Sequence, residues 1–198
     1  MCGNVGMRLM AAVVLAAAGV GCCTKPGMEG HDHMAMMHEN MWASVDRAVA
    51  VIKPTGSNSV AGTIWFDKAG DDVRVHGDFT GLAPNSTHAV HIHEFGDQSS
   101  ADGAAAGSHY DPEGTKHHGK PGDTEPHHPG DLGNVTADAT GKASLDVTLK
   151  GISIAGMKDP ILGRGVVIHA NADDFSQPVG NAGGRLGVGV IGIAKNPS

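Results

Sequence analysis

Aromatic residues and cysteine are both scarce in this sequence. Aromatic side chains make up 4% of the 198 residues, and the three cysteines, Cys2, Cys22 and Cys23, all precede residue 24. The rest of the chain therefore cannot form an internal disulfide bond. Thirty glycines, together with runs of valine, isoleucine and threonine, favour short strands and tight turns over helices.

Positive charge is also in short supply. The chain has 14 basic and 21 acidic residues, which give a net charge of −7, and it contains no basic stripe. Residues 1–21 contain Arg8 and no acidic residue, so their removal makes the remainder still more negative. This balance argues against nucleic acid and against anionic lipid as partners.

Long hydrophobic runs are absent apart from one near the N-terminus. Residues 9–21, LMAAVVLAAAGVG, follow the lone Arg8. The run is too short to cross a bilayer comfortably. We therefore predict that residues 1–21 are a secretory leader and that the remainder is exported.

The end of this leader has two interpretations. Cys22 directly follows the small residue Gly21, which resembles a bacterial lipoprotein processing site, although Gly19 stands where leucine or valine is usual. A lipidated Cys22 would anchor the protein in the cell envelope. The alternative is an ordinary signal peptide that is cleaved, which would leave the protein in the periplasm. An exported domain without a disulfide bond is unusual in either case.

Residues 22–44 have no periodicity that would predict a core element. They are rich in histidine and methionine: His31, His33, His38, Met28, Met34, Met36, Met37 and Met41. Thioethers suit Cu(I) and imidazoles suit Cu(II). We predict a flexible tether, and the same residues are also suited to binding copper.

Residues 45–198 are predicted to form a single all-β domain. Short stretches rich in β-forming residues recur, with turn signals about every 8–12 residues, which is typical of a sandwich or barrel. The predicted strands are 47–54, 59–68, 73–82, 88–96, 134–139, 143–150, 164–170 and 186–194.

A long polar loop is predicted over residues 97–133. It is rich in histidine, glycine, proline and aspartate and has hardly any apolar residue. Such a loop cannot bury a core of its own, so another agent must order it. A metal ion is the natural candidate.

Histidines at two-residue spacing stand out in HAVHIHEFGD (88–97). On a strand, His91 and His93 leave the same face, while Val90 and Ile92 point the other way, into a core. A pair of this kind on its own is more often a structural accident than a metal site. The other histidines of the chain change that balance.

Two sets of metal ligands follow from residue type. His109, His118, His128 and Asp131 offer three imidazoles and a carboxylate, which suits tetrahedral zinc. His91, His93 and His169 offer nitrogen alone, which suits copper. A histidine shared between the two sets could bridge both metals through its two ring nitrogens.

Several motifs, in this order, resemble those of the copper–zinc superoxide dismutases. They are HAVHIHEFGD, GSHYDP, HHPGDLGN, VVIHANADD and GNAGGRLGVGVIGIA. The resemblance covers about residues 45–195. It implies an eight-stranded Greek-key β-barrel, a sandwich architecture for which this family is a standard example.

The resemblance also implies a division of ligands between the two metals. Copper would be bound by His91, His93, His109 and His169, and zinc by His109, His118, His128 and Asp131. His117 remains an alternative to His118. Counting without gaps from His109 favours His117, whereas the Gly-Lys-Pro that follows favours His118, which we prefer.

Further residues have counterparts in the family. Asp173 matches the carboxylate that links a copper histidine to a zinc histidine. Arg185 matches the arginine beside copper that holds superoxide. His88 matches a structural histidine that ties strands together, and His76 is expected to be a surface residue of a strand.

The activity implied is the conversion of superoxide to oxygen and hydrogen peroxide, with copper alternately reduced and oxidised. His109 would leave copper and take up a proton on reduction, and Arg185 would attract the substrate anion. The alternatives are a non-catalytic module that stores or delivers copper or zinc, and a purely structural barrel of the cell envelope. A homodimer is a further expectation, without predicted contacts.

The sequence departs from the family at two places. Members usually have a disulfide bond between the long loop and the last strand, but the loop here has no cysteine and Val188 occupies the last-strand position. The segment between Asp173 and Arg185 is shorter than in animal members and has no lysine. We therefore expect loop order to rest heavily on zinc, and attraction of the anion to rest mainly on Arg185.

Overall fold

A computed structural model describes residues 44–115, 117–125 and 127–197. The predictions for the leader 1–21 and for the tether, apart from Ser44, fall outside these residues. Among the residues described, no helix has the length and apolar character needed to cross a membrane.

The structure contains eight strands, as the sequence predicts, and their ends differ by a few residues from those expected. One short 3-10 helix, η1, lies within the long loop. The elements are β1 Arg47–Pro54, β2 Ala61–Ala69, β3 Asp72–Thr80, β4 Thr87–His93, η1 Ala104–Ala106, β5 Asp131–Thr136, β6 Ala143–Leu149, β7 Gly165–His169 and β8 Arg185–Ile193.

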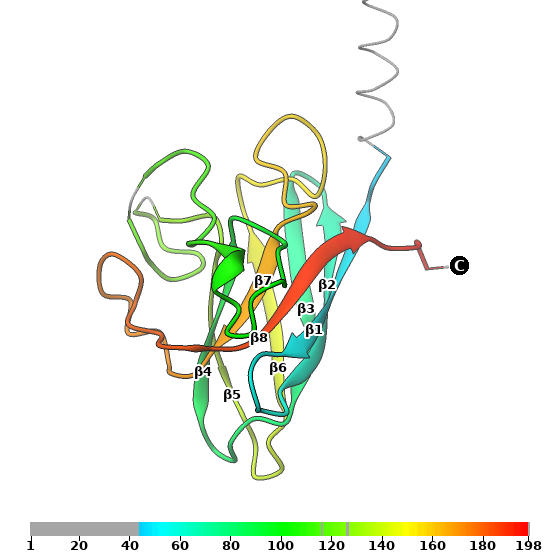
Figure 1. Ribbon diagram of the computed structural model, residues 1–198. Coiled ribbons are helices and arrows are strands. Elements are labelled where there is room, and N and C mark those ends of the chain that lie inside the picture. Colours follow the sequence, from blue (N-terminus) through cyan, green and yellow to red (C-terminus); the bar gives the residue numbers. More distant parts are fainter. Residues whose placement is uncertain (1–43, 116, 126, 198) are drawn as a thin grey trace, which may run out of the picture.

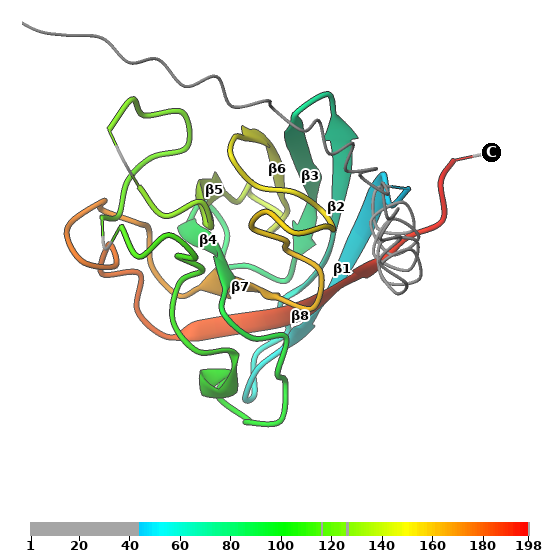
Figure 2. The same cartoon turned by 90° about the horizontal axis from the view of Figure 1, so that it is seen from above.

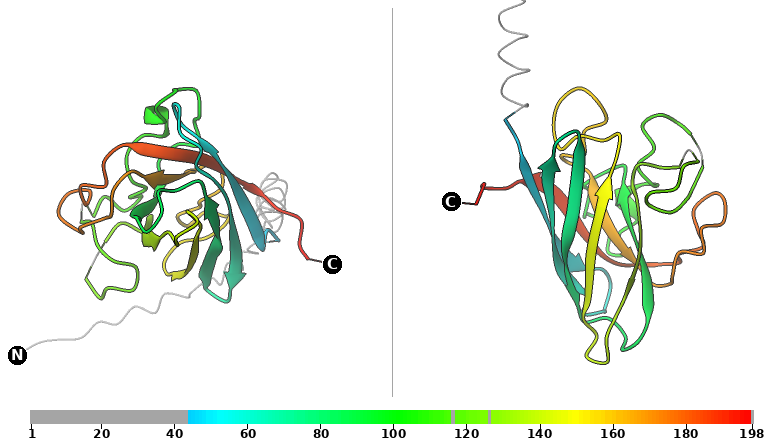
Figure 3. Two further views of the ribbon diagram at one scale, coloured as in Figure 1. Left: turned by 90° about the horizontal axis from the view of Figure 1, so that it is seen from below. Right: turned by 180° about the vertical axis from the view of Figure 1, so that it is seen from behind.

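The eight strands form one antiparallel sheet in the order β5-β4-β7-β8-β1-β2-β3-β6. The sheet curves so that its two end strands, β5 and β6, approach each other (Figure 1 and Figure 3). The result is a nearly closed, barrel-like sheet, consistent with a Greek-key β-barrel. The predicted fold class is confirmed.

Alternation of side chains along the strands builds the core of this barrel. In β1, Ala48, Ala50 and Ile52 are buried, while the residues between them are partly or fully exposed. Phe66 of β2 and Phe79 of β3 are also fully buried inside. Burial of a side chain of this size stabilises the fold by about 1.5–3 kcal/mol.

Strand β4 does not follow this alternation, because it is buried along almost its whole length. Val90 and Ile92 belong to the barrel core. His91 and His93 are on the other face, yet they are 0% and 1% exposed. Loops 94–130 and 170–184, which lie on the same side of the barrel, cover that face (Figure 1 and Figure 2).

The first half of the long loop is held to the barrel by hydrogen bonds of its own. The Phe95 N–H donates to the Ala106 carbonyl at 3.0 Å, and the Gly56 N–H donates to the Ala101 carbonyl at 2.7 Å. The side-chain amide of Gln98 donates to the carbonyl of Val188 at 2.7 Å. This part of the loop therefore has fixed partners on β8 and on the end of β1 without a disulfide bond.

Candidate metal centre

Strand pairing brings the predicted site residues together. His91 of β4 lies opposite Asp131 of β5, and His169 of β7 lies opposite Arg185 of β8. A shift of register occurs next to each of these pairs. Such irregularities bend a strand and redirect its side chains. An isolated bridge between the backbones of His93 and the loop residue His109 adds a further ligand.

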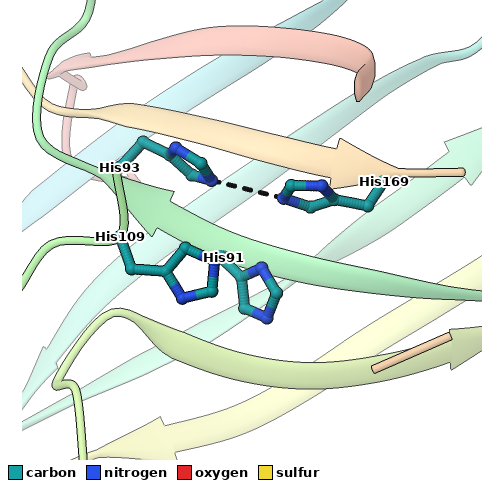
Figure 4. A group of neighbouring side chains, drawn as sticks. All are labelled: His91, His93, His109 and His169. Carbon is teal, nitrogen blue, oxygen red and sulfur yellow. Dashed lines mark hydrogen bonds between the residues drawn. The ribbon is translucent and has the colours of Figure 1, made fainter. Parts of the chain in front are cut away.

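The first group of potential ligands is made of histidines alone. One ring nitrogen from each of His91, His93, His109 and His169 lies within 4.8 Å of the others, and all four side chains are buried. Figure 4 shows the Nε2 atoms of His93 and His169 facing each other at 3.2 Å, with His91 and His109 alongside. These are the four residues predicted to bind copper.

Each strand histidine of this group has its outer nitrogen occupied. The Nε2–H of His91 donates to Asp173 Oδ2 at 2.8 Å, and the Nδ1–H of His93 donates to the carbonyl of Gly107 at 3.0 Å. The Nδ1–H of His169 donates to the carbonyl of Gly183 at 3.3 Å. These bonds fix the tautomers and leave the inner nitrogens with free lone pairs.

The second group of potential ligands surrounds the carboxylate of Asp131. Its Oδ1 lies 3.2 Å from His109 Nδ1 and 3.6 Å from His128 Nδ1, and its Oδ2 lies 2.9 Å from His118 Nδ1. These are the four residues predicted to bind zinc. His91 also approaches this group, since one donor atom from each of His91, His109, His118 and Asp131 lies within 4.8 Å of the others.

Unpartnered nitrogens provide a test of whether these groups fit metal ions. His91, His118 and His128 each have a buried Nδ1 atom without a hydrogen-bond partner. The Nε2–H of His118 is donated to Asp173 at 2.7 Å, so in the neutral ring its Nδ1 turns a lone pair toward an oxygen of Asp131. Two electron pairs at this distance repel each other unless a cation lies between them. The donor sets therefore fit metal ions, with three imidazoles and a carboxylate on one side and nitrogen alone on the other.

His109 belongs to both groups. Its Nδ1 faces Asp131, and its ring centroid lies 4.0 Å from that of His91 and 5.2 Å from that of His93. The remaining nitrogen, Nε2, is therefore available to the histidine group. The structure thus places His109 between the two groups, with one ring nitrogen toward each.

The structure separates the two neighbouring histidines that the sequence left as alternatives. The His118 side chain is buried between Asp131 and Asp173, with a residue exposure of 4%. His117 is exposed. The geometry thus includes His118 in the cluster and leaves His117 outside it.

Burial favours the uncharged form of three histidines in the first group, His93, His109 and His169. It lowers the pKa of His93 well below the usual value, and it lowers the pKa of His169 to about 3. Burial also lowers the pKa of His109, although Asp131 partly opposes this effect. Neutral imidazoles can bind a metal ion without first losing a proton.

In the second group, His118 and Asp131 favour their charged forms when no metal is present. For His118, burial is the largest influence and favours the neutral ring, but the nearby carboxylates of Asp131 and Asp173 together outweigh it and raise the pKa to about 9. Burial opposes ionisation of both aspartates as well, yet their histidine partners hold each pKa far below its usual value. In the metal-free protein, a proton on His118 therefore supplies the positive charge that a metal ion would otherwise supply next to Asp131.

Arg185 lies at the start of β8, next to the histidine group. Its guanidinium donates to the backbone carbonyls of Gly103 and Gly107, at the two ends of η1. Gly107 also accepts the hydrogen bond from His93. The arginine thus joins the loop to the metal-facing strands and brings a permanent positive charge beside His93 and His169.

His88 and His76 also lie outside the cluster. The His88 Nδ1–H donates to the carbonyl of His169 at 2.9 Å, so His88 ties β4 to the end of β7. His76 is on the outer face of β3, where its Nε2 lies 2.7 Å from Asp67. Both positions agree with the roles expected from the sequence.

Two amide side chains were not anticipated from the sequence. Asn134 makes a reciprocal pair with the backbone of Asp173, donating to its carbonyl at 2.9 Å and accepting from its N–H at 2.7 Å. Gln177 makes a similar pair with His118. Nothing in the spacing of either residue indicates its partner, because both contacts join distant segments.

The barrel carries two adjacent, overlapping groups of buried side chains that could each hold a metal ion. The sequence profile of the copper/zinc superoxide dismutases (SODC) matches residues 60–191, and the chain belongs to this family. It is also similar to a solved structure described as that of the clock protein EA4. The two chains are 39% identical, with a TM-score of 0.67, and the match covers 76% of this chain and 96% of the other.

Proposed function

We propose that this protein is a superoxide dismutase that uses copper and zinc. The observation that carries the proposal is the buried group His91, His93, His109 and His169 with Arg185 next to it. Storage of a metal does not require a cation that attracts a substrate anion. Disproportionation of superoxide does, because the anion must be drawn into a protein that is negative overall.

We assign copper to His91, His93, His109 and His169, and zinc to His109, His118, His128 and Asp131. Copper supplies two accessible oxidation states, which the reaction needs and which zinc lacks. The zinc ligands hold one nitrogen of His109 and stiffen the loop that carries it.

Arg185 and His109 are the residues to which we assign direct roles in turnover. The Arg185 guanidinium attracts and orients the superoxide anion. Some of its N–H groups donate to loop carbonyls and hold it in place. His109 holds a proton at Nε2, on the side of the histidine group, while its Nδ1 stays on the side of Asp131. The proton is then available to the reduced product.

A second candidate function is a copper- or zinc-binding module without turnover, which stores or delivers metal. The histidine- and methionine-rich segment before residue 44 favours it. The similar structure is described as a clock protein, and that description names no dismutase activity. Against this alternative stands Arg185, for which storage provides no use.

The two candidates differ in a direct assay. Protein loaded with copper and zinc should consume superoxide at a rate proportional to its copper content. A protein that binds copper stoichiometrically at the histidine group yet consumes no superoxide would support the storage module. A protein that stays free of metal in medium replete with copper and zinc would support a purely structural barrel.

We also propose that the protein is exported to the periplasm or cell envelope and that lipid on Cys22 anchors it. The support is the short apolar run followed by cysteine. Metabolic labelling with a fatty acid should mark the wild-type protein and leave Cys22→Ser unlabelled.

A homodimer is a further proposal. Its support is exposed apolar surface. Phe95 and Val51 are 53% and 55% exposed, and Val190 lies close to Gly96, the chain neighbour of Phe95. Sedimentation analysis of the metal-loaded protein tests this proposal, and a Phe95→Glu variant should shift a dimer toward the monomer.

A further inference from the structure

The loop between β7 and β8 encloses one imidazole, that of His118. Asp173 accepts the Nε2–H of this ring at 2.7 Å, and Phe175 stacks on it with a centroid distance of 6.2 Å and an interplanar angle of 17°. Gly180 approaches so closely that a Cβ atom there would lie 2.6 Å from His118 Nε2. Three residues of a single short loop therefore converge on one ring.

Gln177 completes this enclosure by binding the backbone of the same residue. Its Oε1 accepts from the His118 N–H at 2.8 Å, and its Nε2 donates to the His118 carbonyl at 2.7 Å. A carboxamide carries one acceptor and two donors, so it can pair with both backbone groups of a residue at once. Two bonds fix the orientation of that residue's backbone as well as its position.

Among the described residues, the backbone of His118 has hydrogen bonds only to Gln177. It lies outside the strands, in a polar stretch of loop that no disulfide bond can hold. The adjacent N–H of Gly119 donates to Asp131 at 3.0 Å, and the carbonyl of His117 accepts from the His128 N–H at 2.8 Å. Both neighbours are thus tied to proposed zinc ligands, while His118 itself is tied to Gln177.

We propose that Gln177 is a positioning residue for zinc, which fixes the backbone of His118 so that its Nδ1 stays 2.9 Å from Asp131 Oδ2. This inference rests on the zinc site of the proposed function. It adds that the loop leading to Arg185 takes part in zinc binding through the side chain of Gln177. Zinc binding and the order of this loop are then linked, and the linkage is reciprocal.

The variants Gln177→Ala and Gln177→Met test this role. Methionine keeps most of the volume of glutamine but can form neither hydrogen bond. Both variants should bind zinc roughly ten-fold more weakly in a chelator competition, which is the lower end of the usual cost of losing such a supporting partner. Co(II) placed in the zinc site should show altered visible bands, because the ligand geometry changes.

Gln98→Ala is the matched control. Like the Gln177 variants, it removes a hydrogen bond that a glutamine in a loop makes with a distant backbone group. The bond lost is the one from Gln98 Nε2 to the carbonyl of Val188 at 2.7 Å, and no contact of His118 changes. Its zinc affinity and Co(II) spectrum should equal those of the wild type. A loss of affinity as large as in the Gln177 variants would show general loosening and overturn the proposal.

Wild-type zinc affinity and an unchanged Co(II) spectrum in Gln177→Met would equally overturn it. If the Gln177 variants do not fold, the wild type provides the decision. The amides of 173–181 should become protected from hydrogen exchange over the same zinc concentrations as those of 117–119, and independent protection would contradict the linkage. None of these measurements depends on turnover, so an inactive protein that binds zinc would contradict the dismutase proposal alone.

Discussion

At the scale of single residues, the site works by leaving one nitrogen of each imidazole free. Asp173 occupies the outer nitrogen of His91 and of His118, and backbone carbonyls occupy those of His93 and His169. Such partners cost little in the metal-free protein, because a buried N–H needs an acceptor in any case. The free nitrogens then converge without further reorganisation.

The raised pKa of His118 predicts how the stability of the metal-free protein depends on pH. A histidine whose pKa rises from 6.5 to about 9 on folding stabilises the fold fully below its unfolded pKa and loses that contribution as the pH rises through about 9. Urea unfolding of the metal-free wild type should therefore show a loss of stability between about pH 6.5 and 9.

The matched comparison for this prediction is His118→Gln, which keeps a polar side chain but cannot titrate. The difference in unfolding free energy between the wild type and this variant should shrink as the pH rises through this range. A difference that stays constant from pH 6 to 10 would contradict the raised pKa.

Replacement of Arg185 by alanine tests the role of its charge. We expect turnover to fall by roughly one to two orders of magnitude while both metals stay bound, because the substrate anion loses the positive charge that attracts it. Each factor of ten corresponds to about 1.4 kcal/mol. Arg185→Lys should fall between, because it keeps the charge but loses the planar donor geometry. Turnover is measured on variants of equal copper content.

If this effect lies in attraction of the anion, Arg185→Ala should bind azide more weakly and should lose less rate when salt is added. Full turnover with an unchanged salt response would show that another group attracts superoxide. The guanidinium of Arg185 would then serve to hold the carbonyls of Gly103 and Gly107.

At the scale of the elements, the long loop consists of two parts with different supports. Residues 94–109 return to the barrel through backbone hydrogen bonds and through Gln98, and Ala106 packs with Val167 and Val188 in a small apolar cluster. Residues 110–130 contain the proposed zinc ligands His118 and His128. We therefore expect the order of residues 110–130 to depend on zinc, and that of residues 94–109 to depend on it much less.

Removal of zinc should loosen residues 110–130 far more than residues 94–109. The first part keeps its hydrogen bonds to β8 and to the end of β1, whereas the second loses the cation between its histidines and Asp131. Hydrogen exchange measured by mass spectrometry on the copper-only and the copper–zinc protein tests this. Equal loosening of both parts, or of neither, would contradict the division.

Much of the fold and of the ligand cluster could be predicted from the sequence, because both depend on local patterns. Alternation predicts β1, and two-residue spacing places His91 and His93 on one face. Contacts between distant segments could not be predicted in this way. Gln177 reaches His118 across 59 positions in the chain, and no periodicity records that distance.

Choices between neighbours also required the structure. Counting along the chain left His117 and His118 open, because a loop can gain or lose a residue at little cost in free energy. Burial of the His118 ring between Asp131 and Asp173 separates the two.

At the scale of the whole molecule, the proposed function requires a negatively charged protein to admit a negatively charged substrate. The chain carries a net charge of −7, so distant charges oppose the approach of superoxide and Arg185 must act locally. Superoxide dismutases are a standard example of such local attraction. The segment before the barrel is rich in histidine and methionine, side chains that are suited to binding copper, and we expect it to help copper reach the site.

Deletion of residues 24–43 should leave turnover of the copper-loaded enzyme unchanged but slow the uptake of copper when copper is scarce. Imidazole and thioether groups can bind both oxidation states of copper and raise its concentration near the barrel. Loading rates are compared with those of a chain in which a serine- and glycine-rich segment of equal length replaces 24–43. Equal rates in the wild type and this control would mean that the segment is a spacer.

The most direct test of the account is the metal content of each chain, measured together with superoxide-consuming activity. After loading with both metals, the protein should contain one copper and one zinc per chain, and activity should rise in proportion to copper. Selective loss of zinc in His118→Ala, with copper retained, would place the two metals as proposed. Zinc alone after copper loading, or full copper occupancy without activity, would contradict the central claim.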